Sequence, residues 1–145
     1  MQITTTHNAV EALLAFPFIR SLDQMYPDIA YWYINSVVPN IASGRDLLLL
    51  ATEGSTIHGV ALGKRAADEV KLRCVRVTPA ARNTGLGVRL IDRMLDLLEV
   101  ETPSCSVAEE LIHQYSRLFV NRYGFRLSNV TKGQYRARKL EYHFN

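Results

Sequence analysis

The segment of residues 70–98 constrains the fold of this chain more than any other part of the sequence. Residues 70–77 contain three valines and read as a strand, and they run into a loop that holds Gly85 and Gly87. Beyond the loop, apolar residues recur at the spacing of one helix face, at Val88, Ile91, Leu95 and Leu98. A strand, a glycine loop and an amphipathic helix in this order predict a domain in which helices pack on a sheet.

The start of this helix predicts an anion site. First-turn N–H groups of a helix lack helical partners and point outward, which favours phosphate. Gly85 and Gly87 let a ligand approach the backbone, while Arg82 and Arg89 add positive charge. The Gly-Lys-Ser/Thr of P-loop nucleotide hydrolases and the GxGxxG of dinucleotide-binding proteins are both absent. A tight structural turn without a ligand is the alternative interpretation.

The charge distribution supports an anion more than the total charge does. The net charge of +3 is too small to argue for nucleic acid. Residues 71–93, however, carry six basic side chains against Asp92 alone. This surplus suits a ligand with several negative charges, and a solvated basic face is the alternative.

The rest of the chain completes an α/β pattern. Strands are expected at residues 2–6, 47–52, 57–65, 104–107, 125–130 and 138–144. Helices are expected after Asn8, which can cap the first, and after Asp28, with an end near Pro39. A last helix should cover residues 109–123 and stop at Gly124. We predict one α/β domain (mixed α+β) over residues 1–145, with a mostly antiparallel twisted sheet of six or seven strands and about four helices.

Composition excludes several classes of protein. Apolar residues make up 48% and charged residues 21%, which is typical of a globular chain rather than a disordered one. The longest apolar run, residues 29–34, is far shorter than a bilayer span, and no secretory signal is visible. Cys74 and Cys105 form no CxxC pair, so neither a disulfide scaffold nor a metal site is expected. A reducing cytoplasm is the expected location.

Residues 77–87, V-T-P-A-A-R-N-T-G-L-G, resemble the acyl-CoA signature of the GNAT superfamily of N-acetyltransferases, V-x-P-x-x-R/Q-G-x-G-x-G/A. Tyr123-Gly124-Phe125 resembles the G-F pair that ends a later helix in that family. The resemblance implies a GNAT-like fold whose fourth and fifth strands splay apart. It also implies acetyl-CoA as co-substrate, and direct transfer of acetyl to a primary amine without a covalent acyl-enzyme.

In that family the coenzyme A diphosphate lies on backbone N–H groups of the loop, and pantetheine pairs with the strand before the loop. A backbone N–H of this strand would bind the oxyanion that forms during acetyl transfer. The cofactor-binding residues implied here are Val75, Val77, Arg82, Asn83, Thr84, Gly85, Leu86, Gly87 and Val88. Asn83 replaces a glycine of the signature, and asparagine tolerates left-handed backbone better than most residues.

The catalytic acid departs from the family pattern. Many members carry a tyrosine four residues before the helix-ending glycine, where this chain has Val120. Ser116 and Tyr123 lie at i−4 and i+3 from Val120 and share its helix face, so both are candidate acids, Tyr123 being the better proton donor. A packed tyrosine, with solvent as the proton source, is the alternative.

The acceptor amine must lose a proton before it attacks, because amines of this kind are protonated at neutral pH. Glu109 and Glu110, just past the fifth strand, are the best-placed bases, and His113 lies one turn further on. Acidic residues also favour helix starts electrostatically, so solvated helix-start residues are the alternative.

The sequence does not identify the acceptor further than as a small-molecule or protein amine. Basic residues of the loop near its end, Lys132, Arg136, Arg138 and Lys139, could favour an acidic or RNA-linked acceptor. The strand of residues 139–144 could pair across a homodimer. Two other functions stay open: a coenzyme A-binding sensor that has lost catalysis, and a basic nucleic-acid-binding domain with residues 70–77 as its contact face.

Overall fold

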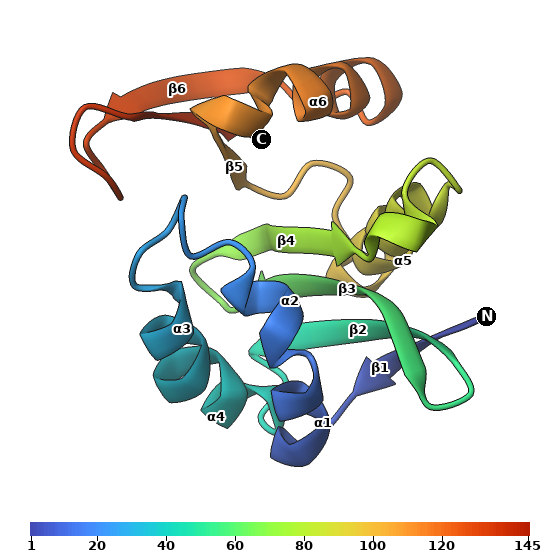
Figure 1. Cartoon of the computed structure of the whole chain (residues 1–145). Coiled ribbons are helices and arrows are strands. Elements are labelled where there is room, and N and C mark those ends of the chain that lie inside the picture. The colour runs from blue at the N-terminus through green and yellow to red at the C-terminus, as the bar shows by residue number, and fades with distance from the viewer.

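A computed structural model describes all 145 residues, and its strands form two antiparallel sheets (Figure 1). The first sheet is a meander in the order β1-β2-β3-β4, formed by β1 (Gln2–Thr6), β2 (Asp46–Glu53), β3 (Thr56–Arg65) and β4 (Val70–Val77). The second has the order β5-β7-β6, formed by β5 (Cys105–Ala108), β7 (Leu140–Phe144) and β6 (Leu127–Lys132). The predicted α/β class and antiparallel meander are therefore confirmed.

The helices form two groups, on opposite faces of the first sheet (Figure 1). One group consists of α1 (Ala9–Leu14), α2 (Phe16–Arg20), α3 (Ile29–Trp32), a π turn (Tyr33–Val37) and α4 (Val38–Ile41). The opposite face carries α5 (Leu86–Leu98), which follows a 3-10 turn (Pro79–Ala81). The second sheet packs with a 3-10 turn (Glu109–Leu111), α6 (Ile112–Arg117) and a π turn (Leu118–Arg122). No helix is both long and apolar enough to cross a membrane.

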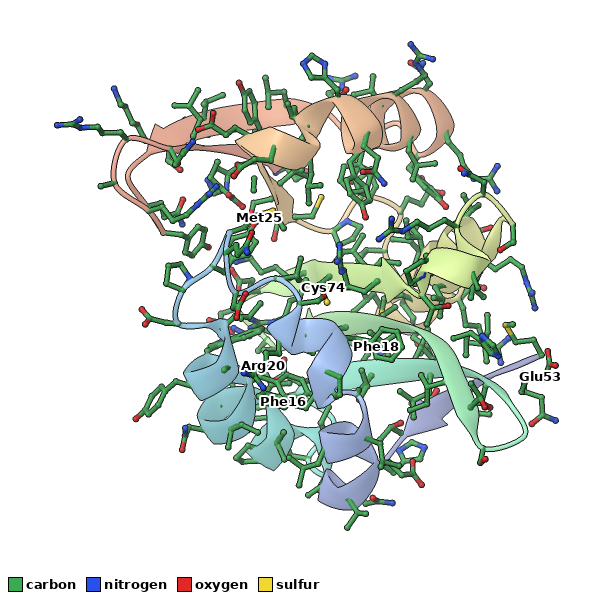
Figure 2. The ribbon with its side chains drawn as sticks, in the orientation of Figure 1. Phe16, Phe18, Arg20, Met25, Glu53 and Cys74 are labelled. Atoms are coloured by element: carbon green, nitrogen blue, oxygen red, sulfur yellow. The ribbon has the colours of Figure 1, made fainter.

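Strand β2 explains why the first sheet is covered on both faces. Its leucine run is apolar on both sides, as in strands that are buried twice. Leu48 and Leu50 belong to the core under α1–α4, while Leu49 and Ala51 belong to the core under α5. Figure 2 shows the side chains in these layers, with Phe16 and Phe18 of α2 labelled; both pack against the α1–α4 core.

The two sheets meet at one end of β4 and β5 and then separate. A single parallel bridge joins Lys71 to Ser104. Ser104 accepts from the Leu72 N–H at 2.9 Å and donates its own N–H to the Val70 carbonyl at 3.1 Å. No backbone hydrogen bond joins the two strands beyond these. The predicted splay of the fourth and fifth strands is confirmed.

A β-bulge lies on β4 beside this splay. Leu62 pairs with Cys74 and Gly63 pairs with Leu72, so Arg73 has no partner on β3. A bulge re-aims the side chains around it. Leu72 and Val75 therefore both pack in the α5 core, although they are three positions apart, while Cys74 packs against the α1–α4 core.

Three expectations about the elements are wrong in detail. The second helical stretch continues through Pro39 to Ile41. A proline ring normally clashes with the carbonyl four residues before it, and the π turn over residues 33–37 widens the helix at that point. Asp28 makes no capping hydrogen bond, whereas Asn8 accepts the Glu11 N–H at 2.9 Å as predicted. The buried face of α5 is rotated from the expected stripe and consists of Leu86, Leu90, Ile91, Met94 and Leu98.

The last strand is also placed differently from the prediction. Residues 140–144 form β7, which pairs with β5 on one side and β6 on the other. A central strand has no free edge, so the expected pairing of residues 139–144 across a dimer is wrong. The exposed edge of this sheet is β6, where Leu127 and Val130 are exposed.

Candidate active site

The loop before α5 has the backbone that the glycine pattern predicts. Asn83 (φ 61°) and Gly85 (φ 86°) both adopt left-handed conformations. Asparagine reaches this region with little strain, so Asn83 is compatible with the loop despite the missing glycine. Thr84 closes the turn by donating its hydroxyl hydrogen to the Ala81 carbonyl at 2.5 Å.

Six consecutive backbone N–H groups of this loop have no acceptor within the protein. They belong to residues 83–88, and the first paired amide in α5 is that of Arg89, which donates to the Gly85 carbonyl at 3.1 Å. A side chain at Gly87 would meet no heavy atom within 4 Å, so the loop faces open space there. Arg82 and Arg89 are exposed and form no ion pair. The arrangement can bind a multiply charged anion through its backbone.

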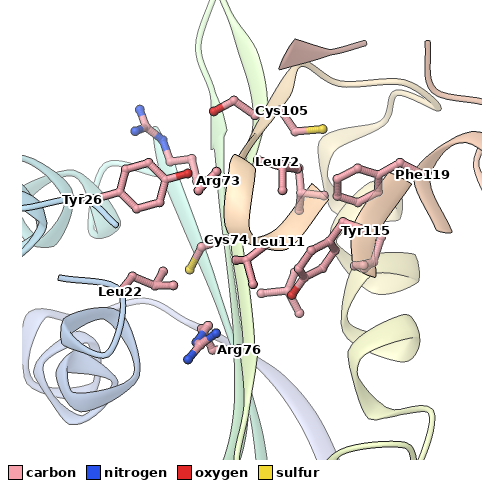
Figure 3. A pocket seen from close by; sticks show the side chains of 15 residues that line it. Leu22, Tyr26, Leu72, Arg73, Cys74, Arg76, Cys105, Leu111, Tyr115 and Phe119 are labelled. Atoms are coloured by element: carbon pink, nitrogen blue, oxygen red, sulfur yellow. The ribbon is translucent and has the colours of Figure 1, made fainter. Parts of the chain in front are cut away.

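A narrow cavity of about 60 Å³ opens along β4 in the splay (Figure 3). It is lined by β4 from Leu72 to Arg76, by β5, and by Tyr115 and Phe119 from the last helix. Figure 3 shows Tyr26, Leu22 and Arg73 on one side of β4, with Tyr115 and Phe119 on the other. Strand β4 lines the cavity and leads directly into the loop of residues 79–85, so one continuous segment of the chain connects the cavity wall to the unpaired amides.

A wider pocket of about 340 Å³ adjoins the cavity on the side of α3. The two share the lining residues Leu22, Tyr26, Leu72, Arg73, Cys74 and Ser106. The wider pocket adds apolar and aromatic groups, including Ile29, Trp32 and Tyr135. Two ligands could therefore approach each other from opposite sides of the β4–β5 gap.

A buried carboxylate stands behind the shared wall. Glu141 of β7 is only 4% exposed, and its Oε2 accepts hydrogen bonds from Tyr26 and from Ser106, each at 2.7 Å. Burial and the hydrogen bond to Glu141 raise the pKa of Tyr26 far above its ordinary value. Both hydroxyls direct their protons at Glu141, so their remaining lone pairs are free to accept from a ligand.

Arg73 brings a positive charge into the wider pocket. Its guanidinium carbon lies 4.9 Å from the centre of the Trp32 ring, a cation–π contact. Its Nε lies 3.4 Å from Oδ1 of buried Asp46. The two terminal nitrogens have no hydrogen bond to the protein and are not among its buried unpaired atoms.

The glutamates expected to act as bases are engaged elsewhere. Glu109 accepts the Leu140 N–H at 2.8 Å and so ties the helix start to β7. Glu110 forms a two-pronged ion pair with Arg136 at 2.6 and 2.7 Å, and this hydrogen bonding lowers the pKa of Glu110 to about 2. Neither residue lines the cavity or the wider pocket. The interpretation of these glutamates as structural residues at a helix start fits their contacts.

The two expected acids also lie outside the cavity. Tyr123 packs on α5, where its hydroxyl donates to Asp92 at 2.7 Å, and burial with this bond raises its pKa to about 12. Ser116 makes no side-chain hydrogen bond and does not line either pocket. His113 is exposed.

The residues that do line the cavity from the last helical segment are Tyr115 and Phe119. Phe119 is buried within the π turn of residues 118–122, whereas Val120 beside it is 46% exposed. Tyr115 lies one turn earlier, and its ring centre is 5.5 Å from that of Phe119. Burial raises the pKa of Tyr115, with Arg76 acting in the opposite direction. Tyr115 is thus the phenol of this helix that lines the splay.

Cys74 lines both pockets, and burial raises its pKa to about 12. A thiol that stays protonated is a poor nucleophile. Cys105, which also lines the narrow cavity, has its pKa raised to about 12 by burial as well, so neither thiol is suited to carry an acyl group.

The basic residues of segment 71–93 divide between two places. Lys71 pairs with Glu69, Arg73 with Asp46, and Arg76 donates to the Ser21 hydroxyl at 3.1 Å, so those on β4 face the cleft region and its rim. Arg82 and Arg89 remain at the amide loop. A flat basic strand face of the kind a nucleic-acid contact needs is not formed, and the nucleic-acid interpretation is not supported.

Comparisons with known proteins agree with this geometry. No protein-family model matches the chain, and no curated protein sequence matches it. Solved structures do match over nearly its whole length. A protein of Desulfovibrio desulfuricans assigned to the GNAT acetyltransferases superposes with a TM-score of 0.76 at 20% identity, covering 99% of this chain and 96% of that one.

Two further structures carry more specific names. The ribosomal-protein-S18-alanine N-acetyltransferase of Escherichia coli has a TM-score of 0.69 at 18% identity, over 99% of this chain and 92% of that chain. The PaiA N-acetyltransferase of Thermoplasma acidophilum, solved in complex with coenzyme A, has a TM-score of 0.67 at 18% identity, over 99% and 98%. This chain therefore has the GNAT fold, as its loop signature predicts.

Proposed function

We propose that this chain is an acetyl-CoA-dependent N-acetyltransferase that transfers acetyl directly to a primary amine. The observation that carries the proposal is the row of six unpaired N–H groups at residues 83–88, in the loop that follows β4, the strand that lines the cavity. A diphosphate on these amides would direct the rest of the donor into the β4–β5 splay. Similar folds solved with coenzyme A support the same ligand.

The donor would be held by the loop and by β4. The amides of residues 83–88 would bind the diphosphate, and Arg82 and Arg89 would neutralise the remaining phosphate charge. The β4 edge from Arg73 to Val77 has no partner strand, so its free backbone groups could pair with pantetheine and stabilise an oxyanion. When bound, acetyl-CoA supplies the acetyl group as an activated thioester.

The amine would enter from the wider pocket and lose its proton there. Ser106 and Tyr26 present oxygen lone pairs to it, because both hydroxyls donate to Glu141. The ammonium proton would pass to the Ser106 oxygen as the Ser106 hydrogen moves to Glu141. Glu141 acts through Ser106, so it is a positioning residue and a proton store rather than a group that touches the substrate.

Tyr115 would complete the transfer. As the amine nitrogen bonds to the acetyl carbon, the bond from that carbon to sulfur breaks and the electron pair leaves on sulfur. The Tyr115 hydroxyl donates a proton to that sulfur, and the phenolate regains one from solvent. A raised pKa keeps this hydroxyl protonated and ready at neutral pH.

Direct assays test the proposal. Acetyl-CoA should raise the melting temperature, and free thiol should appear only when an accepted amine is present. A protein that binds acetyl-CoA but releases no thiol with any of a broad set of amines would instead be the sensor considered from the sequence. Absence of any thermal shift would refute the proposal outright. The two free cysteines fit the predicted cytoplasmic location.

A further inference from the structure

The wider pocket presents two kinds of polar group, and this bears on the acceptor. The hydroxyls of Tyr26 and Ser106 line it and are backed by buried Glu141. The Arg73 guanidinium, stacked on Trp32, also lines it. Ile29, Trp32 and Leu22 supply an apolar part of the lining. A ligand that satisfied the whole lining would carry a cationic amine, an anion and an apolar group.

Arg73 is the cation in this pocket that is free to bind such an anion. Lys71 also lines the pocket, but its Nζ already lies 3.6 Å from Glu69. Asp46 engages only the Nε edge of Arg73. The two terminal nitrogens remain free and form a planar fork, which matches a carboxylate in two-pronged geometry. Asp28 is the only acidic residue in the lining, and it is exposed.

The bulge on β4 is what brings the fork to the pocket. Because Arg73 has no partner on β3, its side chain leaves the alternation of the strand and reaches Trp32 of α3. Asp46 is buried, and burial raises its pKa despite the opposing effect of Arg73. The arrangement keeps Arg73 at the pocket but leaves the buried Asp46 carboxylate poorly paired, which lowers stability. A contribution to stability alone therefore does not explain it.

We infer that the acceptor is a free amino acid with an apolar side chain, its carboxylate bound by Arg73 and its amine by Tyr26 and Ser106. The inference rests on the proposed function for the transfer step, but binding in the pocket can be tested separately. The volume of about 340 Å³ suits a small molecule rather than a folded protein surface. A peptide amino terminus would offer a neutral amide where the fork expects a carboxylate.

Trp32 is the only tryptophan of the chain and lines the pocket, so its fluorescence reports occupancy directly. Three ligands of matched shape are compared: L-leucine, L-leucinamide and 3-methylbutylamine, each with and without saturating coenzyme A. Charge-assisted hydrogen bonds to the carboxylate should make leucine bind about 10- to 100-fold more tightly than either analogue. The same order should appear in kcat/KM for thiol release from acetyl-CoA.

A paired variant tests the role of Arg73. Replacing it alone would strand the Asp46 carboxylate, so the variant is Arg73→Gln with Asp46→Asn, checked for folding by its melting temperature and circular dichroism. It should bind the three ligands with equal affinity. Arg126→Gln, which removes an exposed charge elsewhere, should keep the preference for leucine.

The outcomes separate the two proposals. Equal or tighter binding of leucinamide by the natural protein overturns the inference and points to a peptide or plain amine acceptor. Tighter binding of O-phosphoethanolamine than of leucine overturns the carboxylate assignment in favour of phosphate. A leucine preference without any coenzyme A binding would refute the transferase proposal and leave the amino-acid site standing.

Discussion

Replacing Gly87 by leucine should abolish coenzyme A binding without weakening the fold. Gly87 has ordinary helical backbone, since its φ is not among the positive ones, and a Cβ added there would meet no heavy atom within 4 Å. Glycine costs a helix roughly 0.5–1 kcal/mol relative to a good helix former, so the leucine variant should unfold at the same or a slightly higher temperature. The glycine is therefore not required by packing.

The Gly87→Leu substitution should weaken the binding of coenzyme A and leave the stability of the fold unchanged. A leucine side chain would occupy the space in front of the amides of residues 86–88, where a diphosphate would lie. Losing two hydrogen bonds to a charged group, at about 1.5 kcal/mol each or more, weakens binding at least a hundredfold. Isothermal titration with coenzyme A measures this loss, and thermal unfolding measures stability in parallel.

Gly87→Ala is the matched control, because the GNAT signature accepts alanine at this position. It should gain the same helix stability and still bind coenzyme A. Gly85 is a less clean site, since its φ of 86° makes any substitution strained. If Gly87→Leu binds coenzyme A as tightly as the natural protein, the loop amides do not hold the diphosphate. If the variant unfolds, the leucine side chain meets protein atoms, and the space in front of the loop is not open.

Four other substitutions test the catalytic assignments. Tyr115→Phe should lower kcat about a hundredfold with little change in coenzyme A affinity. Tyr123→Phe should leave kcat unchanged and cost about 1 kcal/mol of stability, because it loses the hydrogen bond to Asp92. The reverse result would restore Tyr123 as the acid. Glu110→Gln should keep full activity and lower stability by less than about 1 kcal/mol, since the pair with Arg136 is partly exposed. The pKa of Glu110 is lowered from 4.5 to about 2, so the stabilisation from this pair is complete above pH 4.5 and is lost as the pH falls toward 2. In acid unfolding, the difference in stability between Glu110→Gln and the natural protein should vanish over that range. A difference that persists below pH 2 would contradict the ion pair as its source. Glu141→Gln should lower kcat/KM and shift its pH profile, and an unchanged profile would exclude Glu141 from the proton path.

The sequence predicts the parts of this fold that depend on local chemistry. The strands expected at residues 47–52 and 57–65 and the Asn8 cap all depend on neighbours a few residues away, and each appears as expected. The pairing of β7 between β5 and β6 depends on contacts far apart in the chain, and no local pattern could distinguish a central strand from an edge. The expectation that residues 139–144 pair across a dimer failed for that reason.

The proposed donor-binding loop could be predicted from the sequence, whereas the proposed acceptor pocket could not. Residues 82–88 form one continuous segment, and the anion site proposed there follows from its glycines and a helix start. The pocket, in contrast, draws Tyr26, Trp32, Arg73 and Ser106 from four separate elements, with Glu141 behind them. One local signal was present in the sequence: the apolar positions of β4 slip by one between Leu72 and Val75. Such a slip indicates a bulge, and a bulge on an edge strand commonly re-aims a functional side chain.

The missing catalytic tyrosine bears on which side chain could supply the proton. Counting four residues back from Gly124, as in the family pattern, reaches Val120, and the Gly124 N–H does donate to the Val120 carbonyl at 3.2 Å. Val120 is nevertheless exposed, and the buried neighbour in this π turn (residues 118–122) is Phe119. A π turn is common at functional sites, and one helical turn earlier on the same inward face lies Tyr115. A phenol displaced by one turn can still reach the splay because the cavity runs along β4 from Leu72 to Arg76. The change at Val120 therefore relocates the proposed acid, and loss of catalysis does not follow from it.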